Sequence, residues 1–153
     1  MSKILAWGQN QVTLTPLGAG GTASVYKSIV ENSTQLETTE GEVTDAVIEG
    51  GEIEASRRAK SSYNLTFQVR IGGGDDTSNT DNIQDTDGVV DGEFSAEVKC
   101  TEATGAPTVK IARCTVSVST SYTSADGIIK TFTCRALKPA TGKMVDIGNG
   151  EEK

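Results

Sequence analysis

Regular alternation of apolar and polar residues over positions 63–71 constrains the fold of this chain more than any other feature. Successive side chains of a β-strand point to opposite faces, so a period of two predicts one face in the core and one polar face. The residues predicted to face the core are Tyr63, Leu65, Phe67, Val69 and Ile71, with Asn64, Thr66, Gln68 and Arg70 between them.

Three further segments carry related patterns. Residues 94–100 alternate in the same way, which predicts another half-buried strand. Within residues 109–118 the apolar positions change from odd to even numbers, which predicts a β-bulge near Ile111. Residues 128–136 read as a last long strand, and the turn-forming residues 124–127 predict that it forms a hairpin with the strand before it.

Other segments are shorter or ambiguous. Gly50 and Gly51 separate two strand-like segments, 43–49 and 52–58, and a two-glycine link predicts a tight hairpin. Residues 12–17 predict a strand that runs into a turn. Residues 24–30 fit a helix face and a β-strand equally well, so both assignments stay open.

Composition sets the fold class. Seventeen glycines and only three prolines in 153 residues suit many short strands joined by turns. Residues 72–92 combine low hydrophobicity with many turn formers, which predicts a long acidic loop. We therefore expect one all-β domain over residues 1–153, a β-sandwich or barrel-like fold with long loops, flexible termini and at most one short helix.

The charge balance argues against a protein that grips nucleic acid. Lys and Arg total 14 against 21 Asp and Glu, a net charge of −7, whereas binding to the phosphate backbone requires surplus positive charge. No apolar stretch reaches the roughly 20 residues that span a bilayer, and the first residues lack the apolar core of a signal peptide. We expect a chain made in the cytoplasm, with no membrane segment.

The chain lacks the residues on which common catalytic and metal sites depend. The chain has no histidine, which removes the usual general base and every Ser-His or Cys-His pair. Cys100, Cys114 and Cys134 have no CxxC spacing, so we expect reduced, buried thiols. The expectation is a protein that is not an enzyme and that has no cofactor and no metal.

Two loop motifs carry part of the pattern of a binding site. Residues 85–88 resemble part of an EF-hand calcium loop, but in that register Ile83 and Phe94 fall at ligand positions one and twelve. The glycines at 72–74 lead into two aspartates, whose charges oppose a bound phosphate. A solvated loop is therefore the prediction for the first motif, and no nucleotide site is expected at the second.

Two blocks of sequence carry a resemblance to a known family. The first runs from NSTQLETTEGE at 32–42 through AVIEGGE at 46–52 to the strand that begins at Tyr63. It is ordered as loop, hairpin and core strand. The second contains VSVS at 116–119, SADG at 124–127, Phe132 and ALKPATGK at 136–143, and DGVV at 87–90 precedes it. In this order the segments resemble the major tail tube proteins of tailed bacteriophages of the Bacteroides type.

This resemblance implies subunits that close into six-membered rings, which stack into a hollow tube through which DNA leaves the capsid. The implied partners are further copies of the chain, other tail proteins, and passing DNA that is not bound specifically. The implied location is the virion tail, after assembly in the bacterial cytoplasm. The family's flanking helix has only weak counterparts here, within residues 72–92 and 24–30.

Fixed negative charge in such a bore would repel the phosphates of passing DNA. The basic residues at 57–60 are expected to pair with carboxylates of a neighbouring subunit, with a merely solvated patch as the alternative. The candidates for the lumen or for contacts between subunits are Glu40, Glu42, Asp45, Glu49, Glu52, Arg57, Arg58 and Lys60, with Glu37 and Glu54 extending the acidic set. The alternative for the acids is the solvated face of an ordinary sandwich.

Other functions remain as alternatives to a tail tube subunit. A capsid decoration protein would use the same type of fold, and a carbohydrate-binding module would carry exposed aromatic residues. A further hypothesis is that the acidic loop and the termini become ordered only on assembly, which would delay polymerisation.

Overall fold

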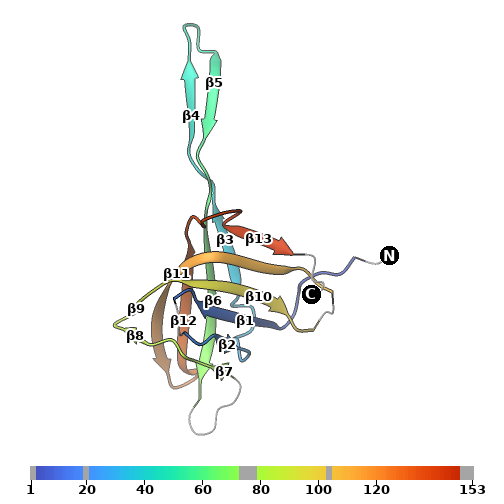
Figure 1. The fold of residues 1–153 in the computed structure, drawn as a ribbon, viewed down its shortest axis with the longest axis vertical. Coiled ribbons are helices and arrows are strands. Elements are labelled where there is room, and N and C mark those ends of the chain that lie inside the picture. Colours follow the sequence, from blue (N-terminus) through green and yellow to red (C-terminus); the bar gives the residue numbers. More distant parts are fainter. Residues whose placement is uncertain (1–2, 19–20, 73–78, 103–104, 149–153) are drawn as a thin grey trace.

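The computed structural model describes residues 3–18, 21–72, 79–102 and 105–148, and within them the chain is all-β without a helix (Figure 1). The prediction of an all-β fold is confirmed. The strands are β1 (Asn10–Pro16), β2 (Ser24–Tyr26), β3 (Gln35–Thr39), β4 (Val43–Val47), β5 (Ile53–Arg58), β6 (Ser62–Ile71), β7 (Asn79–Thr80), β8 (Asp85–Thr86), β9 (Val89–Val90), β10 (Phe94–Cys100), β11 (Thr108–Thr123), β12 (Gly127–Ala136) and β13 (Val145–Gly148).

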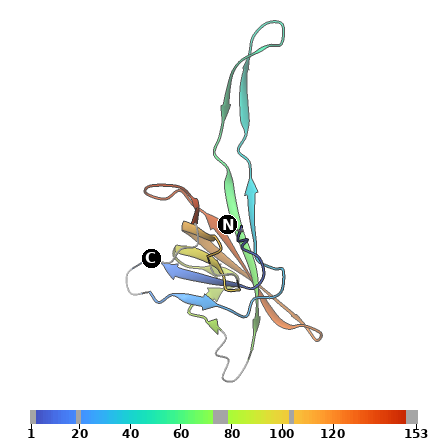
Figure 2. The same ribbon diagram turned by 90° about the vertical axis from the view of Figure 1, so that its right-hand side faces the viewer.

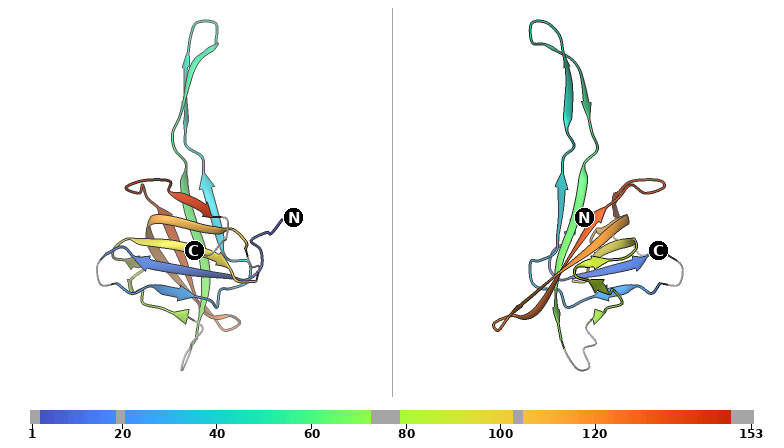
Figure 3. Two further views of the ribbon diagram at one scale, coloured as in Figure 1. Left: turned by 45° about the vertical axis from the view of Figure 1, so that its right-hand side comes forward. Right: turned by 90° about the vertical axis from the view of Figure 1, so that its left-hand side faces the viewer.

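Eleven strands form one antiparallel sheet that curls into a sandwich-like body. Its main order is β3-β6-β12-β11-β10-β1-β2-β7, with β13 and β9 paired to β11 and β8 paired to β9. After β2 the chain returns to β6, where Ile29 forms a β-bridge with Val69 and the Val30 amide donates to the Gln68 carbonyl at 2.9 Å. The sheet therefore closes back on itself, and β1 and β10 cross over β6 and β12 (Figures 1 and 3).

Strand β11 takes part in both layers of the body. Its first part pairs with β10 and β13, and its second part pairs with β12. Ala96 lies opposite Ile111 while Phe94 lies opposite Cys114, so β11 has one extra residue between these two pairs. This is the bulge predicted near Ile111, and bulges bend strands at the corners where they pass from one sheet layer to another.

The core contains the side chains that alternation predicted. Leu65, Phe67 and Val69 of β6 are buried, while Tyr63 and Ile71 at its ends are half-buried and pack against the core. The ring centroid of Phe132 lies 5.1 Å from that of Phe67 and 4.9 Å from that of Tyr26. Aromatic rings at this spacing attract one another in addition to excluding water.

The three cysteines are buried and free, as predicted. Cys114 donates a hydrogen bond from Sγ to the Phe94 carbonyl at 3.2 Å, next to the bulge. A hydrogen bond with Cys114, together with burial, raises the pKa of the Cys134 thiol. These thiols fill the core as small apolar side chains.

Some segments differ from the predictions. Residues 24–30 contain strand β2, which settles the open choice against a helix, and residues 32–42, expected as a loop, contain β3. The region 72–92 was predicted as a loop, but it contains β7, β8 and β9, while its residues 73–78 lie outside the described residues. The terminal residues 1–2 and 149–153, expected to be flexible, also lie outside them.

A hydrogen-bonded ion pair holds the corner of the sheet. Arg113, within the bulge, donates from Nε and Nη2 to the two carboxylate oxygens of Glu93 at 2.8 and 2.7 Å. Its Nη1 donates to the Lys138 carbonyl at 3.0 Å, and its own carbonyl accepts the Leu137 amide at 2.8 Å. One side chain thus connects the start of β10, the bulge and the end of β12.

Replacing Phe132 with Ala tests the aromatic core. We expect the free energy of unfolding to fall by about 3–5 kcal/mol, because truncation leaves a cavity between Tyr26 and Phe67. Tyr122→Ala is the matched control, since Tyr122 is 72% exposed and its loss should change stability by less than about 0.5 kcal/mol. Denaturant unfolding measures both, and equal effects would contradict this account of the core.

The Glu93–Arg113 pair predicts an acid-sensitive component of stability. The hydrogen bonds from Arg113 hold the pKa of Glu93 below its usual range. A carboxyl group whose pKa falls on folding stabilises the folded state above its unfolded pKa, and this contribution disappears as the pH falls through the folded pKa. Glu93→Gln should therefore be less stable than the wild type at neutral pH, and the difference should vanish in acid.

The measurement is denaturant unfolding of both proteins over a series of pH values. A difference between wild type and Glu93→Gln that does not change with pH would show that the ionised carboxylate is not what stabilises the corner.

Candidate functional site

A β-hairpin projects from the body of the molecule (Figures 1 and 3). It consists of β4 and β5, which pair only with each other as a separate two-stranded sheet within the described residues. We call residues 43–58 the arm. Every residue of β4 and of β5 is exposed, so the arm contributes nothing to the core of its own subunit.

The tip of the arm is a glycine turn, as the sequence predicted. Gly50 and Gly51 have φ angles of 93° and 86°, a region that glycine adopts without steric cost. The Ile48 amide donates to the Glu52 carbonyl at 3.0 Å, and the Gly51 amide donates to the Ile48 carbonyl at 3.1 Å. Ala46 pairs with Ala55 and Val47 with Ile53, so β5 has a bulge at Glu54.

The arm continues the β3–β6 pair of the body through a narrow waist. Thr39 pairs with Ser62 on the body side, and the Ala59 amide donates to the Glu42 carbonyl at 2.8 Å on the arm side. Gly41 lies between these two pairings against the opposite backbone. A Cβ atom on Gly41 would collide with the Ala59 carbonyl and would lie 2.7 Å from the Lys60 oxygen. Only glycine therefore fits at the waist without a backbone shift.

The arm exposes large apolar side chains. Val47 and Ile53 lie opposite each other and are 61% and 60% exposed, and Val43 and Ile48 are also exposed. An isolated two-stranded hairpin is at best marginally stable in water, because it has no core to bury its apolar residues. The arm therefore leaves these apolar side chains in contact with solvent.

The structure brings most of the predicted charged residues together on the arm and its waist. Glu40 and Glu42 lie at the waist, Asp45 on β4, Glu49 and Glu52 at the tip, Glu54 on β5, and Glu37 on β3 of the body. Arg57 and Arg58 end β5, and Lys60 follows them at the waist. All ten side chains are exposed.

The bases are confined to one end of the arm. The tip carries only acids, whereas Arg57, Arg58 and Lys60 lie where the arm joins the body, next to the acids of the waist. Arg58 lies 3.9 Å from Glu40, with both side chains mostly exposed. An exposed ion pair at this distance contributes little to stability. The pairing of this basic patch with a neighbouring subunit stays a prediction.

Within the described residues, no group of three or more Cys, Asp or Glu side chains is arranged to hold a metal ion. Residues 85–88, which resemble part of a calcium loop, instead form β8 and the turn of the β8–β9 hairpin, in which Asp87 and Gly88 have φ angles of 52° and 90°. Asp85 accepts the Gly88 amide at 3.0 Å across this turn. Asp81 accepts a hydrogen bond from the Tyr26 hydroxyl at 2.7 Å, and burial and this contact raise the pKa of Tyr26.

Reasoning from sequence missed two features of the arm. The charged candidates were identified, but the exposure of Val43, Val47, Ile48 and Ile53 was not. The sequence signal for this exposure is the acidic run that surrounds these apolar residues. The waist is the second missed feature, and its sequence signal is the glycine between Glu40 and Glu42.

Comparison with known proteins adds no relative. No protein-family model matches the chain, and no curated protein matches it. Among the described residues, the structure contains no helix with the length and apolar character needed to cross a membrane.

Gly41→Ala tests the waist. The added methyl must displace the Ala59 backbone, so the hydrogen bond from Ala59 to Glu42 should weaken by about 1 kcal/mol. Amide hydrogen exchange should show the Ala59 amide exchanging roughly fivefold faster, with the core of β6 unchanged. Gly18→Ala is the matched control, because a Cβ there meets nothing within 4 Å. Equal exchange in both variants would contradict the close approach.

Proposed function

We propose that this chain is the structural subunit of a phage tail tube, and that it assembles into stacked, six-membered rings around a channel for DNA. The resemblance of the segments at 32–63 and 116–143 to the tail tube family supports this proposal. In this proposal, the subunit assembles with its own copies and with other tail proteins in the bacterial cytoplasm. It then acts in the virion tail.

The exposed arm is the observation that carries the proposal. A subunit that worked alone would gain nothing from a projecting hairpin that exposes Val47 and Ile53. In an assembly, the same hairpin buries these side chains against another subunit. The gain is roughly 25 cal/mol for each Å² of apolar surface removed from water.

The edges of the curled sheet provide a second kind of contact. Within the described residues, β3 pairs with β6 alone and β7 with β2 alone, so each leaves one edge open. Open edges offer backbone amides and carbonyls that another chain can pair with. Subunits that continue each other's sheets around a ring would use these edges.

The net charge of −7 suits a conduit for DNA. Acidic side chains facing a bore would repel phosphate and keep DNA from adhering to the wall. The acids of the waist and β3, which lie on the body side of the arm, are the candidates for this role: Glu37, Glu40 and Glu42.

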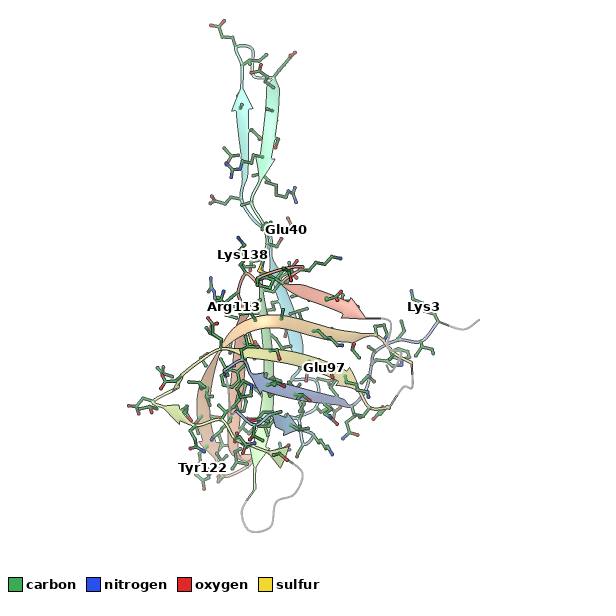
Figure 4. The ribbon with its side chains drawn as sticks, in the orientation of Figure 1. Lys3, Glu40, Glu97, Arg113, Tyr122 and Lys138 are labelled. Atoms are coloured by element: carbon green, nitrogen blue, oxygen red, sulfur yellow. The ribbon has the colours of Figure 1, made fainter. Side chains whose placement is uncertain are left out.

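A carbohydrate-binding module and a capsid decoration protein are the alternatives. Exposed aromatic residues favour the first, and Trp7 and Tyr122 are 71% and 72% exposed. They belong to different parts of the molecule, however: Trp7 precedes β1, and Tyr122 lies near the tip of the β11–β12 hairpin (Figure 4). Two separated rings do not form a flat platform for a sugar.

Electron microscopy and sedimentation of the purified protein test the proposal. We expect rings or tubes from the wild type. A variant with residues 43–58 replaced by a short glycine-serine turn should fold but remain dispersed, because the arm buries nothing in its own subunit. Retained body folding is checked by circular dichroism. A wild type that stays monomeric at all concentrations, or that binds glycans instead, would overturn the proposal.

A further inference from the structure

A cleft of about 630 Å³ lies at the base of the arm. Lys60 and Tyr63, at the waist and the start of β6, form one side. The segment between β12 and β13 forms the other, with Lys138, Lys143 and Met144. Lys138 lies at the end of the body from which the arm projects (Figure 4).

The cleft has a basic rim and an apolar floor. Lysine is the only charged residue type among its lining residues, which include no Asp or Glu. In the described part of the chain, no ion pair involves Lys60, Lys138 or Lys143. Tyr63, Met144 and Val145 pack against the core, so the floor is fixed to the body. The cleft therefore suits a ligand that is acidic and partly apolar.

The tip of the arm has the complementary character. Residues 47–54 read VIEGGEIE, with three glutamates, no basic residue and three large apolar side chains. Val47, Ile48 and Ile53 are exposed beside these glutamates. A narrow hairpin with acids flanking apolar residues matches a cleft whose lysines surround an apolar floor.

The tip cannot reach the cleft of its own subunit. Strands rise about 3.3 Å per residue, so the extended hairpin places Gly50 up to roughly 33 Å from Lys60 at the cleft. The arm points away from the body and does not fold back (Figures 2 and 3). Any tip that occupies the cleft must belong to a second copy of the chain.

We infer that the acidic tip of the arm, residues 47–54, docks in the Lys60–Lys138–Lys143 cleft of another copy. This inference rests on the proposed self-assembly and names the surface that receives the arm. The contact is heterologous, because tip and cleft are different surfaces of one chain. Each docked subunit still offers its own cleft and tip, so the contact can extend an assembly from both ends.

Charge reversal on each side of the contact tests this inference. Glu49→Lys with Glu52→Lys places lysines against the basic rim, and Lys138→Glu with Lys143→Glu places acids against the acidic tip. Each pair of substitutions should raise the concentration needed for assembly by at least about tenfold, since like charges in contact cost more than about 1.4 kcal/mol. Combining all four restores opposite charges and should return assembly to near the wild-type concentration.

A matched control makes the same change in net charge as the reversal at the tip, but at other positions. Glu31→Lys with Asp91→Lys alters two exposed acids outside the arm and the cleft, and it should leave assembly close to wild type. Sedimentation measures the assembled fraction, and circular dichroism confirms that every variant is folded.

The outcomes separate this inference from the proposed function. If the wild type assembles and either reversed pair assembles equally well, the tip and the cleft do not meet, although self-assembly stands. Loss in both reversed pairs without recovery in the combined variant would also overturn the docking. A wild type that never assembles would overturn the docking and the proposed function together.

Discussion

The architecture depends on the bulge in β11, because this single strand belongs to both layers of the body. Ile111 faces the core before the bulge, and Cys114, Val116 and Val118 face it afterwards. In a regular strand, residues 111 and 114 would point to opposite faces. The extra residue corrects the parity, so the strand can turn the corner and keep its apolar side chains inside. Arg113 and Glu93 then fix the corner from outside the core.

The arm differs from the body because it has no buried face. Where β6 covers the core, its side chains alternate between buried and less buried positions, whereas beyond the waist every residue of β4 and β5 is exposed. Beyond the waist the two chain segments pair again through the Ala59 amide, the Glu42 carbonyl and the β4–β5 ladder, but no side chain is buried there. The arm thus depends for its stability on its connection to the body, and on the proposed assembly it would also gain a surface that buries Val47 and Ile53. The same residues that weaken it as a hairpin suit it as an interface.

Much of this fold could be predicted from periodicity, but the segments without a strong pattern could not. Leu65, Phe67 and Val69 identified β6, and the parity change identified the bulge, because one buried face leaves a clear signal. Strand β3 escaped prediction because it lies at an edge, where only Leu36 is half-buried. Asp87-Gly88 is a dipeptide typical of a hairpin turn, but the sequence interpretation compared it only with a calcium loop.

The candidate site was predictable in its charges and not in its shape. A run of acids containing two adjacent glycines indicated a hairpin, but whether that hairpin lies on the body or projects from it depends on burial by distant segments. The cleft is harder to predict, since it joins Lys60 to Lys138 and Lys143, which lie far from it in sequence. No local sequence pattern predicts that these three lysines lie at one cleft.

The distribution of charge along the molecule affects which contacts form in the proposed assembly. At a net charge of −7, subunits repel one another at long range, which favours dispersed chains at low concentration. Over a Debye length of about 8 Å at physiological salt, however, local charge matters more than the total. An acidic tip that approaches a cleft lined with lysines is attracted at this range, while tip-to-tip encounters are repelled. General repulsion combined with one attractive pairing favours head-to-tail contacts, which are the contacts that a stacked assembly requires.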